Sequence, residues 1–354
     1  MTESSSLNFN HTVRYMKPSQ RFVLQLRSQL KLKPRSSVTI LIGAVLLLFA
    51  LISCVKEPPP PLRVGTNVWP GYETLYLARS LGYYDNTPIR LVDYPSGTEE
   101  VRAYQNGEIE AAGISLDQAL VLAATNPDVR IVTVMDFSAG GDAILGKPNM
   151  KNLQDLKGRR VGVESTSLGA FVITRALGKV GLSPKDVQIV PLQVSEHERA
   201  FKEGKIDAVV TFGSPLTKLL ATGAKILFDS KQIPGEIVDV LIVRASAIQN
   251  QPNMVQVLIN GRFRALEYLQ SNPQDAVARI ALRTGVTPKQ FLQSLEGLSQ
   301  PSLQENQRLL SKTDPTLLYS INLLAQVMLE NNLLPKAVDT TPLLDDRFVK
   351  NAKW

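Results

Sequence analysis

Polar and aromatic side chains gather in four loops, each of which follows an apolar run typical of a buried strand. In the first loop, Trp69 and Tyr72 flank Pro70-Gly71 after the run that starts at Leu62. An indole and a phenol in such a loop can stack on a flat ligand or face a cation. Trp69 could equally pack beneath the loop. The first loop is therefore a candidate ligand contact with a structural alternative.

The next two loops offer hydroxyl groups and carboxylates. Ser115 ends a short apolar run, where it could cap the following helix, bond a ligand, or do both. Asp136, Ser138 and Asp142 surround Gly140-Gly141, a pair that lets the backbone approach a ligand closely. Two carboxylates in one cleft suit an amine or another cationic group, although one of them could instead hold the neighbouring backbone.

A fourth loop carries Ser165, Thr166 and Ser167 just before a helix that is predicted to begin near Leu168. Backbone N–H groups and hydroxyls at a helix N-terminus bind anions, and a plain Ser/Thr cap is the alternative. Asp239, in a later apolar run, is a weaker candidate. The acids of the third loop and the hydroxyls at the helix start in the fourth together predict a small polar ligand that carries both signs of charge.

Other chemistries have little support in the residue types present. The two histidines are His11 and His197, and the second lies in a charged helical start where solvent exposure is expected. With these two histidines, we expect no metal centre and no Ser-His-Asp arrangement, and therefore no catalytic residues. Gly141 to Lys147 has the spacing of a phosphate loop, but Pro148 replaces the required Ser or Thr. No cofactor is expected.

The net charge of +7 belongs almost entirely to the N-terminal part of the chain. Residues 1–53 hold seven Lys or Arg residues against the single acid Glu3, a net of +6. The remaining residues are close to neutral and have no basic surface that would attract a polyanion. A nucleic-acid partner is therefore not expected.

Residues 1–53 read as a leader. Val38–Ser53 is a run of 16 residues without a charge after a basic stretch, shorter than the roughly 20 residues that span a bilayer. It ends in Leu51-Ile52-Ser53-Cys54, which resembles a bacterial lipobox with Cys54, the sole cysteine, as the lipidated residue. An uncleaved membrane anchor is the alternative. Residues 54–61 follow as a proline-rich, stiff spacer.

An internal repeat organises the rest of the chain. Arg63-Val64-Gly65 recurs 97 residues later as Arg160-Val161-Gly162, and Gly107–Ala111 recurs at the same offset as Gly204–Ala208. Short apolar runs alternate with helical patterns in each half, as in α/β proteins. The sequence predicts two similar α/β lobes.

A mostly helical part follows from about residue 248. Three N-cap residues precede a proline there, in Asn272-Pro273, Thr287-Pro288 and Asp314-Pro315. Two apolar stripes at helical spacing are expected to pack in the core. They are Val255, Ile259, Phe263, Leu266 and Leu269, and Leu317, Ile321, Leu324 and Met328.

Several stretches resemble the type II periplasmic binding proteins, and most of all their nitrate, sulfonate, taurine and thiamine-precursor group. These stretches are 69–72, 75–84, 106–111, 136–142, 155–163 and 233–240. The Trp-Pro-Gly-Tyr and Ser-x-Gly-Gly-Asp motifs are found in fewer of these proteins than the other stretches and are therefore more specific. The loop at Phe212-Gly213-Ser214 departs from the family, in which an aromatic residue followed by an acid or amide usually contacts ligand. That departure weakens any transfer of ligand identity.

The resemblance implies a two-lobed fold with a ligand cleft, lobe I at 62–143 plus 240–354 and lobe II at 144–239. It further implies a monomeric, extracytoplasmic, lipid-anchored solute-binding subunit that serves the permease and ATPase of an ABC importer. Two alternatives remain. A thiamine-pyrimidine-synthase-like enzyme shares the fold, but that group has a cysteine-rich motif and an active-site histidine. A ligand-sensing lobe without transport would look the same in sequence.

Overall fold

The computed structural model describes residues 60–311, 313 and 316–354. The leader, Cys54 and most of the spacer lie outside this range, as do Asp314 and Pro315. No helix in the described part is long and apolar enough to cross a membrane. The apolar run at 38–53 belongs to the part that is not described.

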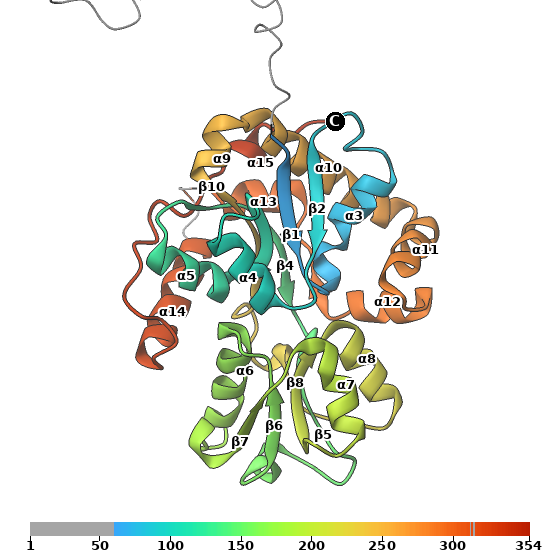
Figure 1. Cartoon of the computed structure of the whole chain (residues 1–354), viewed down its shortest axis with the longest axis vertical. Helices are drawn as coiled ribbons and strands as arrows, with labels where there is room; N and C mark the ends of the chain where they lie inside the picture. Colours follow the sequence, from blue (N-terminus) through green and yellow to red (C-terminus); the bar gives the residue numbers. More distant parts are fainter. Residues whose placement is uncertain (1–59, 312, 314–315) are drawn as a thin grey trace, which may run out of the picture. The chain divides into compact units, whose positions relative to one another are not determined.

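The folded unit contains two open sheets (Figure 1). The first has the order β11(Leu298–Ser299), β4(Val129–Ser138), β10(Val238–Arg244), β3(Ala111–Ser115), β1(Leu62–Thr66), β2(Ile89–Asp93). The second has the order β7(Gln188–Pro191), β6(Arg160–Val163), β8(Ala208–Phe212), β5(Asp142–Gly146), β9(Lys225–Asp229). Strands β1, β2 and β3 run parallel, as do β6, β7 and β8. The predicted α/β fold with two similar lobes is confirmed.

Helices cover both sheets and build the C-terminal part. The helices that precede β10 are α3(Glu73–Ser80), α4(Gly97–Gln105), α5(Leu116–Thr125), α6(Ser167–Gly178), α7(Val194–Lys202) and α8(Gly213–Ala221). After it come α9(Ala245–Asn250), α10(Pro252–Ser271), α11(Pro273–Thr284), α12(Pro288–Leu295), α13(Leu303–Leu309), α14(Thr316–Glu330) and α15(Arg347–Lys350). Both predicted apolar stripes, on α10 and α14, are buried. Thr287 caps α12, whereas Asn272 makes no side-chain cap bond.

The 97-residue repeat encodes the same clamp in each lobe. The guanidinium of Arg63 at the start of β1 bonds the Glu110 carboxylate and the Gly107 carbonyl. Arg160 at the start of β6 does the same to Asp207 and the Gly204 carbonyl, with Nε–Oδ2 at 3.0 Å. In both lobes the clamp joins the first parallel strand to the loop before its neighbour. The repeat therefore fixes the strand register of the two lobes alike.

The chain passes between the sheets twice. It leaves β4 at Ser138 and enters β5 at Asp142, and it returns between Asp229 and Val238. Each crossing lies slightly earlier than the predicted lobe bounds, because Asp142 already pairs with β8 and Val238 already pairs with β4. Ser230 ties the two crossings together, since its hydroxyl bonds Ser138 Oγ at 2.8 Å and accepts from the Gly140 N–H at 2.6 Å.

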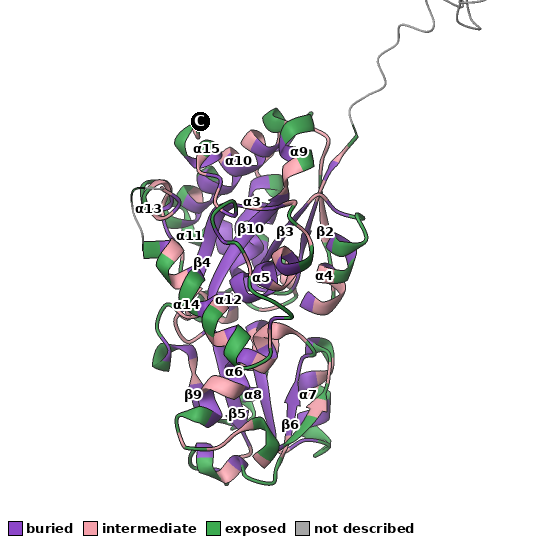
Figure 2. Ribbon diagram, turned by 90° about the vertical axis from the view of Figure 1, so that its left-hand side faces the viewer, coloured by how far each residue is buried: buried purple, intermediate pink, exposed green. Residues whose placement is uncertain are grey.

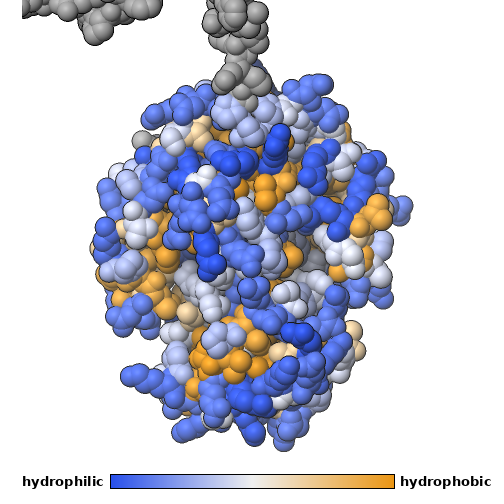
Figure 3. All heavy atoms as spheres, viewed as in Figure 1, coloured by the Kyte–Doolittle hydropathy of each residue, from blue (hydrophilic) through white to orange (hydrophobic). Residues whose placement is uncertain are grey.

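Burial follows the sheets. The central strands of both lobes are mostly buried, whereas exposed residues lie on helix surfaces, turns and the edge strands β2, β7 and β9 (Figure 2). Figure 3 shows that hydrophilic residues cover most of one face, with apolar residues in separate areas. Because the parallel strands of each lobe end toward the other lobe, the loops that follow them meet between the sheets. That meeting place is where the sequence predicted the ligand contacts.

Candidate functional site

A small buried cavity lies between the carboxyl ends of the parallel strands of the two lobes. Its volume is about 20 Å³, room for roughly one water molecule. Both lobes contribute to its wall, which consists of Asn67, Trp69, Tyr72, Gly97, Ser115, Gln118, Asp142, Glu164, Thr166, Leu168, Phe212 and Asp239. Ligands of open α/β sheets bind in this position, beyond the strand ends.

Positions related by the internal repeat face each other in this cavity. Asn67 and Glu164 directly follow the first strand of their lobes, and they lie 97 residues apart. Trp69 and Thr166 lie at the same offset, as do Ser115 and Phe212 at the ends of β3 and β8. Each lobe thus contributes the same strand-end positions to the cavity wall, but the side chains at these positions differ between the lobes.

Trp69 forms the floor of the cavity and is 4% exposed. Its indole Nε1 donates to both carboxylate oxygens of Asp136, at 3.2 and 3.1 Å. Its ring meets Phe212 of the other lobe edge to face, with centroids 5.7 Å apart. Gly71 is required beside this pair, because a Cβ at that position would lie 1.8 Å from Asp136 Oδ2. The Trp-Pro-Gly-Tyr word therefore encodes a tightly packed indole–carboxylate contact.

Tyr72 and Asp239 form a second buried pair. The Tyr72 hydroxyl donates to Asp239 Oδ1, and its ring lies against Gly113 of β3, where a Cβ would come within 3.0 Å of it. Asp239 pairs with Ser115 on one side of β10 and with Asp136 on the other. The sheet thus places three predicted site residues side by side.

Six of the ten predicted ligand residues line the cavity. They are Trp69, Tyr72, Ser115, Asp142, Thr166 and Asp239. Asp136 does not line the cavity, but it accepts a hydrogen bond from Trp69, which does. Thr166 also caps α6, since its Oγ1 accepts from the Gly169 N–H at 3.2 Å.

Three of the four predicted serines, Ser138, Ser165 and Ser167, do not line this cavity. Ser138 lies in the first crossing, where its Oγ bonds Ser230 and accepts from the Asp142 N–H. Ser165 and Ser167 line a separate cavity of about 230 Å³ beside α4 and α5. Ser167 Oγ donates to Asp117 of the opposite lobe. The Ser138 hydroxyl thus holds the crossing, and the Ser167 hydroxyl makes a contact between the lobes.

Burial raises the pKa of several carboxyls at the site. It raises the pKa of Asp136 to about 7, although the Trp69 N–H and the charge of Arg262 act against this. Burial raises the pKa of Asp142 to about 7 as well, and the neighbouring Asp117 carboxylate adds to the effect. The pKa of Asp239 is raised well above its usual range by burial and by Asp136. A group of buried acids such as this one favours protonation or a positively charged partner.

Asn67, Gln118, Glu164 and Phe212 were not among the predicted ligand residues. The repeat could have found Phe212, which is the counterpart of the predicted Ser115, whereas Glu164 is the counterpart of Asn67, which was not predicted either. Gly213, which departs from the family pattern, has φ of 58° and would bring a Cβ to 2.9 Å from the Val68 carbonyl oxygen. A glycine is needed there because the two lobes approach closely.

The prediction that His197 is solvated is wrong. His197 is fully buried, and its Nδ1 lies 3.1 Å from Thr211 Oγ1. Helical spacing places it with Val194, Ala200 and Phe201 on the inner face of α7. Burial lowers its pKa to about 4, so the ring is neutral at pH 7.

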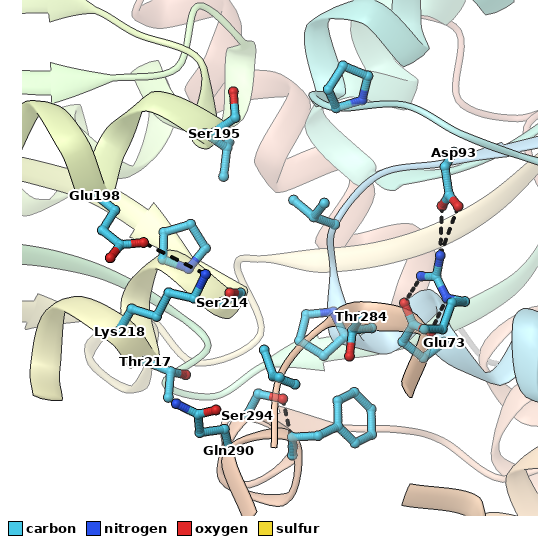
Figure 4. Close-up of a pocket in the computed structure, with 18 of the residues that line it drawn as sticks. Glu73, Asp93, Ser195, Glu198, Ser214, Thr217, Lys218, Thr284, Gln290 and Ser294 are labelled. Carbon is cyan, nitrogen blue, oxygen red and sulfur yellow. Dashed lines mark hydrogen bonds and ion pairs between the residues drawn. The ribbon is translucent and has the colours of Figure 1, made fainter. Parts of the chain in front are cut away.

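A larger cavity of about 570 Å³ lies on the other side of the loop at 67–70 (Figure 4). Helices α7 and α8 of one lobe line it together with α12 and the loop before α3 of the other. Its main charges pair within the wall, Lys218 with Glu198, and Arg283 with Glu73 and Asp93. Among the described residues, no group of three or more His, Cys, Asp or Glu side chains is arranged to hold a metal ion.

Comparison with known proteins identifies the family. The sequence profile of a family described as NMT1/THI5 like matches residues 69–276, more than half of the chain. The chain belongs to the NMT1/THI5-like family. The resemblance stated from the sequence is therefore confirmed at the level of the family.

Relatives of this NMT1/THI5-like chain include two proteins of Escherichia coli K12. The taurine-binding periplasmic protein is 24% identical over 62% of this chain and 73% of its own length. A putative aliphatic sulfonates-binding protein is 23% identical over 86% of this chain and 95% of its own length.

Solved structures share the fold. The alkanesulfonate-binding protein SsuA of Xanthomonas axonopodis pv. citri, solved with MOPS bound, has a TM-score of 0.67 at 20% identity. The match covers 80% of this chain and 97% of that protein. The desulfurization enzyme DszB has a TM-score of 0.61 at 17% identity, covering 82% of this chain and 98% of its own. The periplasmic-binding-protein fold is thus shared by binding proteins and by an enzyme.

Proposed function

We propose that this chain is the extracytoplasmic solute-binding subunit of an ABC importer, which captures a small polar ligand by closing its lobes. The observation that carries the proposal is the cavity between the strand ends, because residues of both lobes line it. A ligand held by both lobes stabilises the closed over the open conformation, and a membrane permease can read that difference.

The lobes are in contact around the cavity in this conformation. Glu164 of the second lobe accepts from the Thr98 N–H of the first at 3.3 Å, and Gln193 Nε2 donates to Glu99 Oε1 at 3.4 Å. Ser167 adds its bond to Asp117 across the same gap. A cavity of about 20 Å³ is too small for a solute of the size of taurine. Entry therefore requires the lobes to separate, as an importer subunit of this kind would do.

The partners in this proposal are the solute, the permease and the ATPase, with the chain acting as a monomer. The relatives named as periplasmic binding proteins support an extracytoplasmic location. The enzyme alternative has no observation of its own here, because Cys54 is the sole cysteine and His197 is buried against Thr211. We therefore assign no catalytic residue.

Ligand binding is tested by thermal unfolding of the full chain in detergent against sulfonates, nitrate, bicarbonate, amines and thiamine precursors. A compound that binds only the folded state stabilises it by about 2.7 kcal/mol at 100 times its Kd. At least one class should raise Tm with the logarithm of its concentration. Unchanged melting with every class would contradict the proposal. Normal uptake of the bound compound in cells lacking the chain would favour a sensing lobe.

Lipid anchoring at Cys54 is the second part of the proposal and rests on the lipobox-like end of the apolar run. Cys54→Ala removes the thiol that would carry the lipid. The variant should lose incorporation of labelled fatty acid, while the wild-type chain is labelled and sediments with membranes. Replacing Ser53 with alanine keeps the small residue before the cysteine and is the matched control. Equal labelling of the Cys54→Ala variant and the wild type would refute the anchor.

A further inference from the structure

We propose that the solute carries a cationic group, such as a protonated amine or amidine on a compact and partly flat body, which binds the Asp142 carboxylate. This inference rests on the proposed function and names the ligand class for the same cavity. It departs from the relatives named for taurine and aliphatic sulfonates. Three sets of contacts carry it.

The first is the charge of the cavity wall. Asp142, Glu164 and Asp239 line it, and no lysine, arginine or histidine does so in the described part of the chain. Asp117 and Asp136 lie close behind and add to the negative potential at Asp142 and Asp239. The positive group nearest Asp136 is Arg262, whose guanidinium bonds backbone carbonyls on the far side. An anion in this cavity would face carboxylates from both lobes.

The second is an acceptor with no donor. Asp142 is 2% exposed, and its Oδ2 has no hydrogen-bond partner among the described residues. A buried carboxylate oxygen without a donor is strongly unfavourable, whereas a charged N–H donor makes one of the strongest hydrogen bonds available. Because Asp142 lines the cavity, a ligand ammonium or amidinium can supply that donor.

The third is the use of the helix N-termini. These ends offer N–H groups that would bind a sulfonate, but side chains of this protein already occupy three of them, at α4, α5 and α6. Glu164 reaches across the lobes to the Thr98 N–H at the start of α4, and Asp117 accepts from the N–H groups that begin α5. Thr166 caps α6. The N–H donors at these three helix ends are therefore taken by the chain's own carboxylates and hydroxyl, whereas the start of α8, after Phe212, is left without a side-chain cap.

Aromatic rings complete the recognition of a cation. Trp69, Tyr72 and Phe212 all line the cavity. Aromatic faces attract cations and stack on flat groups, and desolvation strengthens the attraction. Carboxylates with aromatic walls favour a charged organic amine over a hydrated inorganic ion.

The experiment is calorimetry of the full chain at pH 8 with matched probes. The probes are ethylammonium with ethanesulfonate, and benzamidine with benzamide and benzenesulfonate, together with the zwitterion taurine. We expect binding of the cations, at least tenfold weaker in Asp142→Asn. Asp85→Asn, an exposed acid remote from the cavity, should bind as wild type. Cation binding should also weaken from pH 8 to pH 6, because protons then compete at Asp142 and at its neighbours Asp117, Asp136, Asp239 and Glu164.

The outcomes separate the two proposals. Binding of sulfonates without cations would overturn the cationic ligand and leave the solute-binding function in place. Equal cation affinity in Asp142→Asn and wild type would overturn the assignment to Asp142. No binding of any probe would count against both proposals. Far-UV circular dichroism and urea unfolding of each variant exclude misfolding as the cause of a loss.

Discussion

Replacing Arg262 with methionine is expected to lower the free energy of unfolding by about 3–5 kcal/mol, the usual effect of breaking a buried charge network. Arg262 is fully buried on α10, and its Nη2 donates to the Met135 carbonyl oxygen at 2.7 Å. Its Nη1 lies 3.4 Å from the Pro301 carbonyl oxygen. Burial lowers the pKa of Arg262 to about 10, so the group still carries its charge at pH 7. Methionine keeps the bulk but removes the donor to the Met135 carbonyl and the positive charge that acts on Asp136, while the Pro301 carbonyl keeps its bond from Asn306 Nδ2.

Urea unfolding at pH 7 measures this effect. The matched control is Arg264→Met, two residues along the same helix, where the arginine is exposed and lies over the Tyr83 ring at 3.9 Å. That change should alter the unfolding free energy by less than about 1 kcal/mol. If both variants unfold at the same urea concentration, Arg262 does not support the site in the way described.

The unliganded protein should become less stable as pH rises from 5.5 to 8, by about 3 kcal/mol. Asp136 and Asp142 have folded-state pKa values of about 7, above their ordinary value. The folded state therefore binds more protons than the unfolded state between about pH 4 and 7. The stability that these protons provide is lost as pH rises through 7. His197 acts in the opposite sense between about pH 4 and 6.5, but it is one group against several acids.

Urea midpoints of wild type, Asp142→Asn and Asp85→Asn at pH 5.5 and pH 8 provide the measurement. Asp142→Asn removes one of the buried charges, so it should be more stable than wild type at pH 8 and less sensitive to pH. Asp85→Asn should follow wild type. A wild-type stability that rises from pH 5.5 to 8 would contradict the raised carboxyl pKa values. Greater stability with weaker ligand binding in Asp142→Asn would mark this aspartate as retained for recognition.

The sequence was sufficient to predict the two lobes and several strand-end residues. The repeated Arg63 and Arg160 positions act through the same clamp, and strand ends in parallel sheets meet at one edge. Trp69 and Thr166 could be placed from that logic alone. These features depend on local pattern and on the repeat, which a single sequence displays directly.

Other parts of the site depend on pairing between distant segments. Asp239 reaches the cavity because β10 returns after the second crossing and inserts between β3 and β4, with an irregularity in register beside Asp239. Ser138 turns to Ser230 instead, because the two crossings lie side by side. Glu164 reaches the cavity because it directly follows β6, next to the hydroxyl-rich loop at 165–167. No local pattern indicates which of these side chains faces the cleft.

The larger cavity beside the loop at 67–70 has a consequence for control of the protein. Both lobes line it, α7 and α8 from one lobe and α11 and α12 from the other (Figure 4). A molecule that filled it would touch both lobes, so its affinity would depend on the angle between them. Allosteric linkage is reciprocal, and each site would then change the affinity of the other by the same factor. A compound that binds the larger cavity could therefore change the affinity of the smaller cavity for its ligand without resembling that ligand.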